Sequence, residues 1–194
     1  MRPSDFLRDQ FQLYRLWILE RTARRVRDPE ASGRTADMQV QFLDRHARRD
    51  WVCKHASDAD WPQFRTALQH GHDLVVASRQ GRALGWAWIG YERVFLPPLG
   101  REIRLPEGTA YLYESYVRPS ERGRGVGKRL VAARCRHADG LGLERLLTHV
   151  VAGNQASLRA LQSHDFRIVG RTHFLRALVL RIWTRAPLPV STVG

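Results

Sequence analysis

The segment from Tyr111 to Leu130 constrains the fold of this chain more than any other part of the sequence. An apolar, aromatic run passes through a proline-containing turn into Arg-Gly-Arg-Gly-Val-Gly, after which an amphipathic helix is expected. Glycines at alternate positions let a backbone turn sharply and approach a ligand with no Cβ atoms in between. The unpaired amides and the positive dipole end at the start of a helix favour phosphate. The segment therefore predicts a strand, a phosphate-binding turn and a helix in succession.

Two other glycine-rich phosphate loops have a different spacing. A P-loop needs a glycine five residues before the Gly-Lys pair and a Ser or Thr after it. Arg122 and Arg129 occupy those positions here. The dinucleotide fingerprint is Gly-x-Gly-x-x-Gly after the first strand of a βαβ unit, whereas this chain has Gly-x-Gly-x-Gly far from its start. A glycine-rich turn that only caps an ordinary helix is the simpler alternative.

The pattern that fits is Arg-x-x-Gly-x-Gly, with Arg122, Gly125 and Gly127 at the fixed positions. It resembles the acetyl-coenzyme A signature of the GNAT superfamily of N-acetyltransferases. The resemblance extends from about residue 73 to residue 166, roughly half of the chain, and fades towards both ends.

A second stretch of the sequence supports this resemblance. In the superfamily, a strand is followed by Asn, a small residue three positions later, a helix and then usually Gly-Phe. Asn154, Ser157 and Phe166 are in register with that pattern. Asn154 is also a good N-cap residue, so helix capping alone is an alternative for it. Asp165 replaces the usual Gly and is expected to adopt the left-handed conformation.

The resemblance implies an α/β (α+β) fold in which a mixed, mostly antiparallel central sheet is flanked by helices. It implies an acyltransferase enzyme that moves an acetyl group from acetyl-coenzyme A directly to a primary amine of a small molecule or peptide. A catalytically weak protein that senses acyl-coenzyme A or regulates a partner is the alternative. That alternative arises because Leu161 stands where many members have a Tyr that protonates the departing thiolate. We expect Leu161 to pack against the acceptor.

By the same resemblance, the coenzyme is held mainly by the backbone. The amides of Tyr116 and Val117 would bind the pantetheine arm or polarise the thioester carbonyl, and Asn154 would hydrogen-bond that arm, with Ser157 beside it. Arg124 or Arg129 would contact the 3′-phosphate. The pyrophosphate would lie on the segment Arg122, Gly123, Arg124, Gly125, Val126, Gly127 and Lys128.

Acyl transfer to an amine also needs a base. Glu114 lies three residues before Val117, where many superfamily members have a catalytic Glu, and partial burial among tyrosines would raise its pKa. The alternative is a strand Glu that pairs with an arginine. His149 is the second candidate, because imidazole titrates near neutrality, although its side chain could point into the core or solvent. Trp86, Trp88 and Tyr91 could line an acceptor pocket or belong to the sheet core.

Composition limits the choice of partners and compartment. The net charge of +13 would attract polyanions, and coenzyme A is one. The arginines are spread along the chain with no nucleic-acid signature, so no specific nucleic acid is expected. No apolar stretch reaches the ~18 residues of a membrane helix, and the start of the chain is too charged for a signal peptide. Cys53 and Cys135 lack metal-ligand spacing, so no metal is expected, and two isolated cysteines suit a reducing cytoplasm. The sequence leaves open whether the protein forms a homodimer.

The N-terminal part of the chain is harder to assign. Residues 6–26 are apolar at both helical and alternating spacing, so a helix and a strand are equally compatible with them. The other elements expected before residue 73 are a helix over 38–48, a short strand over 51–56 and a helix from Ser57 to about His70. Residues 1–50 are interpreted as an N-terminal helical or first-strand region of the same domain.

The pattern then becomes β. We expect a hairpin of strands 74–78 and 83–94 joined at 79–82, a long connection over 97–108, and strands over 111–117 and 144–151. One or two strands follow Phe166. The acyltransferase domain is placed at residues 51–185, and the tail at 186–194 is expected to be disordered.

Overall fold

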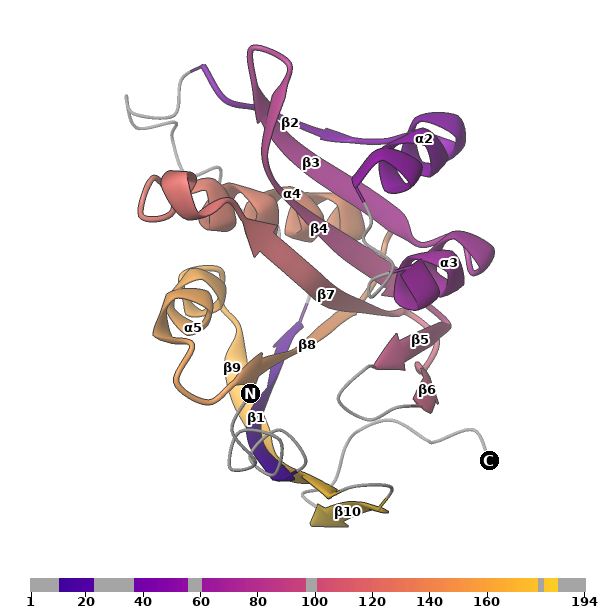
Figure 1. Cartoon of the computed structure of the whole chain (residues 1–194), viewed down its shortest axis with the longest axis vertical. Helices are drawn as coiled ribbons and strands as arrows, with labels where there is room; N and C mark the ends of the chain where they lie inside the picture. The colour runs from indigo at the N-terminus through magenta and orange to yellow at the C-terminus, as the bar shows by residue number, and fades with distance from the viewer. Residues whose placement is uncertain (1–10, 23–36, 56–60, 97–100, 178–179, 185–194) are drawn as a thin grey trace, which may run out of the picture.

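The computed structural model describes residues 11–22, 37–55, 61–96, 101–177 and 180–184. In these residues the chain forms one large sheet and a separate small hairpin sheet (Figure 1). The strand order in the large sheet is β10-β9-β1-β8-β7-β4-β3-β2, and the pair β7–β8 is parallel while the other pairs are antiparallel. The strands are β1 Phe11–Thr22, β2 Gln39–Phe42, β3 Asp73–Arg79, β4 Arg82–Tyr91, β7 Thr109–Val117, β8 Arg145–Val151, β9 Arg167–Ala177 and β10 Leu180–Thr184.

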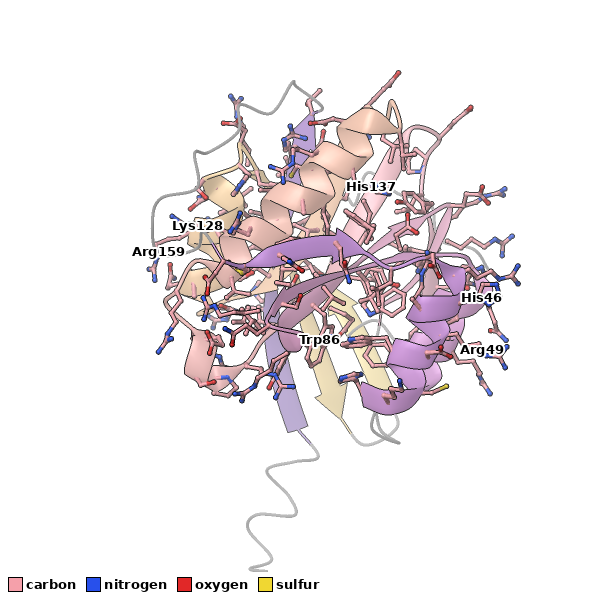
Figure 2. All side chains as sticks on the ribbon, turned by 90° about the horizontal axis from the view of Figure 1, so that it is seen from above. His46, Arg49, Trp86, Lys128, His137 and Arg159 are labelled. Atoms are coloured by element: carbon pink, nitrogen blue, oxygen red, sulfur yellow. The ribbon has the colours of Figure 1, made fainter. Side chains whose placement is uncertain are left out.

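Helices cover both faces of this sheet. The helices are α2 Arg45–His55, α3 Trp61–Gln69, α4 Val126–Gly140 and α5 Gln155–Gln162. Seen from above, α2 and α4 lie on opposite sides of the sheet (Figure 2). Trp88 points to the face of α2 and α3, where it joins Val52 and Phe64 in one core. Its neighbour Ile89 joins the core beneath α4 and α5. Because the central strands are buried on both faces, they are apolar nearly throughout.

The first strand settles the ambiguity of the N-terminal sequence. β1 pairs with β8 on one side and β9 on the other, so its backbone must be extended. Leu16 and Leu19 are buried there. A register shift between Ile18 and Leu19 explains the mixed spacing, because a bulge moves the apolar side chains out of strict alternation.

Two predictions for residues 38–56 are wrong. The segment expected to be a helix begins with β2, which pairs with β3. The segment expected to be a strand belongs to α2. The change occurs at Asp44, whose carboxylate accepts hydrogen bonds from the amides of His46 and Ala47, both at 2.9 Å. This is an N-cap, so Asp44 ends the strand region and starts the helix.

The hairpin of β3 and β4 is confirmed. Its two loop residues, Gln80 and Gly81, have φ of 49° and 75°, as a tight two-residue turn requires. The second strand ends at Tyr91, earlier than predicted. Val94 belongs to the short strand β5 Arg93–Leu96, which pairs with β6 Arg101–Arg104. The region expected to be a long connection therefore contains a strand.

The predicted strands near Tyr111 and His149, and those after Phe166, correspond to β7, β8, β9 and β10. The fold class predicted from the resemblance is confirmed. Ser57, residues 97–100 and the tail 186–194 lie outside the described residues.

Candidate functional site

The strand β7 carries an extra residue where it approaches the glycine-rich turn. Trp88 of β4 pairs with Tyr113 and Trp86 pairs with Tyr116, so one residue on β4 faces two on β7. Glu114 lies in this interval with a φ of 46°, a conformation that is uncommon for a residue other than glycine. The sequence alternation predicted a regular strand here. The structure has a β-bulge instead.

The bulge reverses the phase of the side chains that follow it. Tyr113 packs in the core beneath α2 and α3. Tyr116 stacks on Trp86, which packs against that same core, although plain alternation would place Tyr113 and Tyr116 on opposite faces. Ser115 instead accepts a hydrogen bond from Arg134 of α4. Val117 packs against the cluster beneath α4.

The parallel pairing of β7 and β8 ends in the middle of both strands. The register runs from Thr109 and Arg145 to Leu112 and Thr148. At the last pair, the Thr148 hydroxyl donates to the Leu112 carbonyl at 2.7 Å. Beyond this pair the two strands diverge toward their carboxyl ends, on the side where α4 and α5 begin (Figure 1). The facing backbone edges of two diverging strands are suited to an extended ligand, which hydrogen-bonds like an added strand.

The glycine-rich turn forms as predicted at the start of α4. A short 3₁₀ helix, Pro119–Glu121, follows β7. Gly123 and Gly125 then have φ of 76° and 82°, and Gly125 is the N-cap of α4. The first helical hydrogen bond runs from the Arg129 amide to the Gly125 carbonyl at 3.1 Å. The amides of the first turn before it have no acceptor within the helix, which makes this turn a site for an anion.

Gly127 differs from the other two glycines because it lies inside the helix. A Cβ built on Gly127 would lie 3.8 Å from a methyl group of Val117, an ordinary contact. Gly127 therefore lies against the end of β7 at a place where a Cβ would fit, and neither the turn nor this packing requires a glycine there.

Cations surround this turn. Arg122, Arg124 and Lys128 are exposed, and the Arg122 side chain also donates to the Val117 carbonyl at 3.3 Å. Lys128 of α4 and Arg159 of α5 both face the same side of the molecule (Figure 2). Arg129 is half-buried and donates to the carbonyl of Met38 at 3.3 Å. Arg124 is therefore better placed than Arg129 to contact a phosphate.

Asn154 and Ser157 meet at the start of α5. The Asn154 side chain accepts a hydrogen bond from the Ser157 amide at 3.1 Å, so the predicted N-cap is confirmed. Phe166 is buried beneath this helix, and Asp165 has the expected left-handed conformation with a φ of 66°.

The two candidate bases have different surroundings. The Glu114 side chain is half-buried at the bulge. His149 shares a hydrogen bond of 2.9 Å between its Nδ1 atom and the Tyr111 hydroxyl. Burial lowers the pKa of His149 to about 4 and raises the pKa of Tyr111. At neutral pH the imidazole is therefore uncharged, the phenol keeps its proton, and the two groups share one hydrogen bond. Glu114 is partly open to solvent at the bulge, whereas His149 is tied to Tyr111, so Glu114 is the better-placed candidate.

Aromatic side chains extend from the bulge to α2. Tyr116, 38% exposed, stacks on Trp86 at a centroid distance of 4.3 Å. Trp86 meets the edge of Trp51 at 5.0 Å, and Trp51 stacks on His55 at 4.3 Å. We refer to these four residues as the aromatic row. Trp51 and His55 were missed as site residues because their segment was predicted to be a strand.

Of the two alternatives left open for Trp88 and Tyr91, the sheet core is the one observed, and the expectation for Leu161 is wrong. Trp88 is fully buried in the core, and the Tyr91 hydroxyl donates to Asp73 at 2.8 Å. Leu161 is only 4% exposed and packs in the core with Leu19 and Phe166. Leu161 was expected to contact the acceptor because its helix begins at the site, but the helix turns this residue toward the sheet.

Arg134 was also missed by sequence reasoning. It lies in the i, i+4 series Val126, Leu130, Arg134 and Ala138, whose members are all buried on one stripe of α4. A basic residue in an apolar helical stripe was the available signal, and it was hidden by the abundance of arginine in this chain.

In the described part of the chain, none of the helices has both the length and the apolar character needed to cross a membrane. The same residues contain no group of three or more His, Cys, Asp or Glu side chains arranged to hold a metal ion.

Comparison with known proteins identifies relatives of this chain. An uncharacterized N-acetyltransferase of Bacillus subtilis, YdgE, is 25% identical over 122 residues, which cover 60% of this chain and 71% of that protein. The L-methionine sulfoximine/L-methionine sulfone acetyltransferase of Pseudomonas aeruginosa is 32% identical over 111 residues. That match spans 56% of this chain and 58% of the Pseudomonas protein.

Solved structures share the fold. AAC(6′)-Iy in complex with the bisubstrate analogue CoA-S-monomethyl-acetylneamine has a TM-score of 0.52 and 22% identity, over 69% of this chain and 92% of that one. A Drosophila protein has a TM-score of 0.60 and 13% identity, over 86% of this chain and 52% of that one. The profile of the acetyltransferase (GNAT) family matches residues 40–166, more than half of the chain. The chain is therefore an acyltransferase enzyme that belongs to the GNAT family of acetyltransferases.

Proposed function

We propose that this protein is an N-acetyltransferase that moves an acetyl group from acetyl-coenzyme A directly to a primary amine. The observation that carries the proposal is the course of β7. This single strand contains the bulge at Glu114, diverges from β8, and leads into the glycine cap of α4. Along the chain, β7 thus provides first a base, then an extended binding edge and then an anion site. The acetyl group, the pantetheine arm and the pyrophosphate of acetyl-coenzyme A follow one another in the same order.

The residues present fit a pyrophosphate group. Two left-handed glycines, Gly123 and Gly125, turn the chain. The first-turn amides of Val126, Gly127 and Lys128 then face the anion. A Cβ on Gly123 would meet no atom within 4 Å, so the turn is open outward. The guanidinium groups of Arg122 and Arg124 and the ammonium group of Lys128 would neutralise the phosphates.

The thioester end would lie between the diverging strands. The backbone amides of Tyr116 and Val117 are proposed to bind the pantetheine arm or to polarise the thioester carbonyl. Asn154 and Ser157, held together at the start of α5, are proposed to bind the arm from the side of β8.

Glu114 is proposed to accept the proton that the acceptor amine loses. The amine nitrogen then forms a bond to the acetyl carbon, and the bond from that carbon to sulfur breaks. Sulfur leaves as a thiolate, and the nitrogen releases its second proton to that thiolate, directly or through solvent, which leaves the neutral amide and the free thiol. His149 is less suited to take the first proton, because the Nδ1 atom of its imidazole is engaged with the Tyr111 hydroxyl at 2.9 Å.

The aromatic row is proposed to form one wall for the acceptor. Tyr116 and Trp86 are stacked next to the bulge; the exposed ring of Tyr116 and the half-buried ring of Trp86 favour an amine with a flat or apolar body. The Pseudomonas relative is named for two methionine derivatives. Amino acid derivatives and other small primary amines are therefore the first acceptors to test.

The protein is proposed to work in the cytoplasm. Cys53 is exposed and Cys135 is buried, and both are free thiols. A reducing compartment maintains such thiols.

The test combines binding with turnover. Calorimetry with acetyl-coenzyme A measures binding, and release of free thiol measures transfer to a panel of amino acid derivatives, aromatic amines, aminoglycosides and peptides. We expect binding and thiol release with at least one amine. Binding without thiol release for every amine would contradict transfer to an amine and favour a sensor of acyl-coenzyme A.

A further inference from the structure

We propose that Arg134 is a positioning residue for acyl transfer, which holds the β7 bulge in its reactive shape from beneath. Arg134 is 2% exposed and lies on α4, on the opposite face of the sheet from the aromatic row. This inference rests on the proposed function, because it assigns a role in that same reaction.

The contacts of Arg134 connect α4 to both strands of the bulge. Its Nη2 atom donates to the Ser115 hydroxyl at 2.9 Å, and its Nη1 atom donates to the Trp88 carbonyl at 3.1 Å. Nε donates to the Leu130 carbonyl of its own helix at 3.3 Å. Trp88 belongs to the last regular pair before the bulge, and Ser115 belongs to the bulge itself. One rigid, planar side chain thus fixes the relative position of β4 and the bulged segment.

The requirements of the core do not explain an arginine at this place. Its hydrogen-bond partners in the described part of the chain are three neutral oxygens, and removal of a charge from water costs several kcal/mol unless it is well compensated. Burial lowers the pKa of Arg134 to about 10, so the group is still charged at neutral pH. The residues one helical turn away on the same stripe, Leu130 and Ala138, are apolar. An apolar residue would therefore pack here at lower cost.

The position of Arg134 suits the reaction. Ser115 follows Glu114 directly, and the amides proposed to meet the thioester belong to the next two residues, Tyr116 and Val117. A bulge that shifts by about 1 Å would misplace all of these groups together, and a misplacement of that size reduces rates by about 10²-fold.

The first experiment examines the bulge without depending on activity. Hydrogen exchange is compared in the wild-type protein and in Arg134→Met, which keeps the length but removes the charge and the donors. We expect exchange of the Ser115 to Val117 amides to accelerate about tenfold, while the amides in the middle of α4 keep their protection. Equal protection of the bulge in the folded variant would overturn the proposal.

The second experiment separates positioning from a merely structural effect. With an amine that the wild-type protein acetylates, Arg134→Met is expected to lower kcat about 10-fold to 100-fold, with little change in the Kd for acetyl-coenzyme A. Arg134→Lys keeps the charge and should recover part of kcat. The matched control is Arg136→Met, an exposed arginine on the same helix, which should retain kcat. A wild-type kcat in Arg134→Met, or a loss of kcat that only follows a loss of coenzyme affinity, would overturn the proposal.

Ser115→Ala keeps the test decisive if Arg134→Met does not fold. This variant removes one hydroxyl and leaves the cation in place. It should lower kcat about threefold to tenfold, and no change in kcat would overturn the proposal. If the wild-type protein acetylates no amine, the proposed function fails, whereas the exchange experiment still decides the role of Arg134 at the bulge.

Discussion

Glu114 occupies a backbone conformation that few residues with a side chain adopt, with a φ of 46° in an otherwise extended strand. Such strain persists where the surrounding structure enforces it, and it costs about 1 to 3 kcal/mol. Here the neighbours that enforce it are identifiable. Ser115 is tied to Arg134, and Tyr116 is stacked on Trp86. The strained residue is also the proposed base, so the strain coincides with the reacting position.

Glu114→Gln tests the base directly. The amide keeps the size and the backbone preference of the side chain but cannot accept the proton. We expect kcat to fall by about 10²-fold, the usual size of a general-base effect, while calorimetry gives an unchanged affinity for acetyl-coenzyme A.

A control for this prediction is Glu144→Gln, at an exposed carboxylate just before β8, which should retain full activity. A nearly unchanged rate in Glu114→Gln would assign the proton transfer to another group, and His149→Asn would be the next variant.

At the scale of elements, the turn before α4 depends on glycine for its shape. Gly125 has a φ of 82°, so any side chain introduces strain of about 1 to 2 kcal/mol. We expect Gly125→Ala to lower stability by that amount and to weaken binding of acetyl-coenzyme A at least tenfold, because the turn can no longer present its amides. Thermal unfolding and calorimetry provide the two measurements.

Gly142→Ala is the matched control for the strain. Gly142 has a φ of 71°, and a Cβ there would meet no atom within 4 Å, but it lies after the other end of α4. The Gly142→Ala variant should lose about as much stability as Gly125→Ala and should retain its affinity for acetyl-coenzyme A. If both variants bind acetyl-coenzyme A as the wild-type protein does, the turn is not the phosphate site.

The contact between β4 and β7 depends on a second glycine. A Cβ on Gly85 would lie 2.5 Å from the Tyr116 carbonyl oxygen and 3.2 Å from a methyl group of Val126. Gly85→Ala would therefore separate β4, the end of β7 and the start of α4. We expect a loss of about 1 to 3 kcal/mol in unfolding free energy, as for other overpacked cores, measured by denaturant titration.

The comparison for Gly85→Ala is Gly140→Ala in the last turn of α4, where a Cβ would be unobstructed. That change should be neutral or stabilising, since alanine favours a helix more than glycine does. Equal stability of the two variants would mean that β4 and β7 can move apart without cost.

At the scale of the whole molecule, two histidines connect stability to pH, of which His72 is buried and His149 is half-buried. His72 is fully buried between the Tyr113 hydroxyl and the Arg93 carbonyl, and His149 contacts Tyr111. Burial lowers the pKa of each to about 4, compared with 6.5 in the unfolded chain. Between pH 6.5 and 4 the unfolded state therefore binds more protons than the folded state.

The sign of the effect follows from this difference. Stabilisation from these neutral histidines is complete above about pH 6.5 and is lost as the pH falls toward 4. We expect Tm to decrease steadily over this range, and the decrease to be smaller in His72→Gln. His46→Gln, at an exposed histidine on α2, is the control. If Tm depends on pH in the same way in His72→Gln and in the wild-type protein, His72 is not a source of the pH dependence.

Local chemistry determined the parts of the site that the sequence predicted. The glycines of the turn, the N-cap at Asn154 and the left-handed Asp165 each follow from the preferences of one residue and its near neighbours in the chain. For this reason, the turn, the helix starts and the strands near them could be predicted from the order of residues alone.

Contacts between distant segments determined what the sequence could not predict. The bulge at Glu114 arises from the register between β4 and β7, and it exchanges the faces that Ser115 and Tyr116 occupy. Arg134 becomes a buried partner of that bulge only when α4 packs on the sheet, and Leu161 becomes core for the same reason. Strand register and helix docking depend on the summed packing of residues far apart in the chain. Only the tertiary structure therefore decided which side chains face the site.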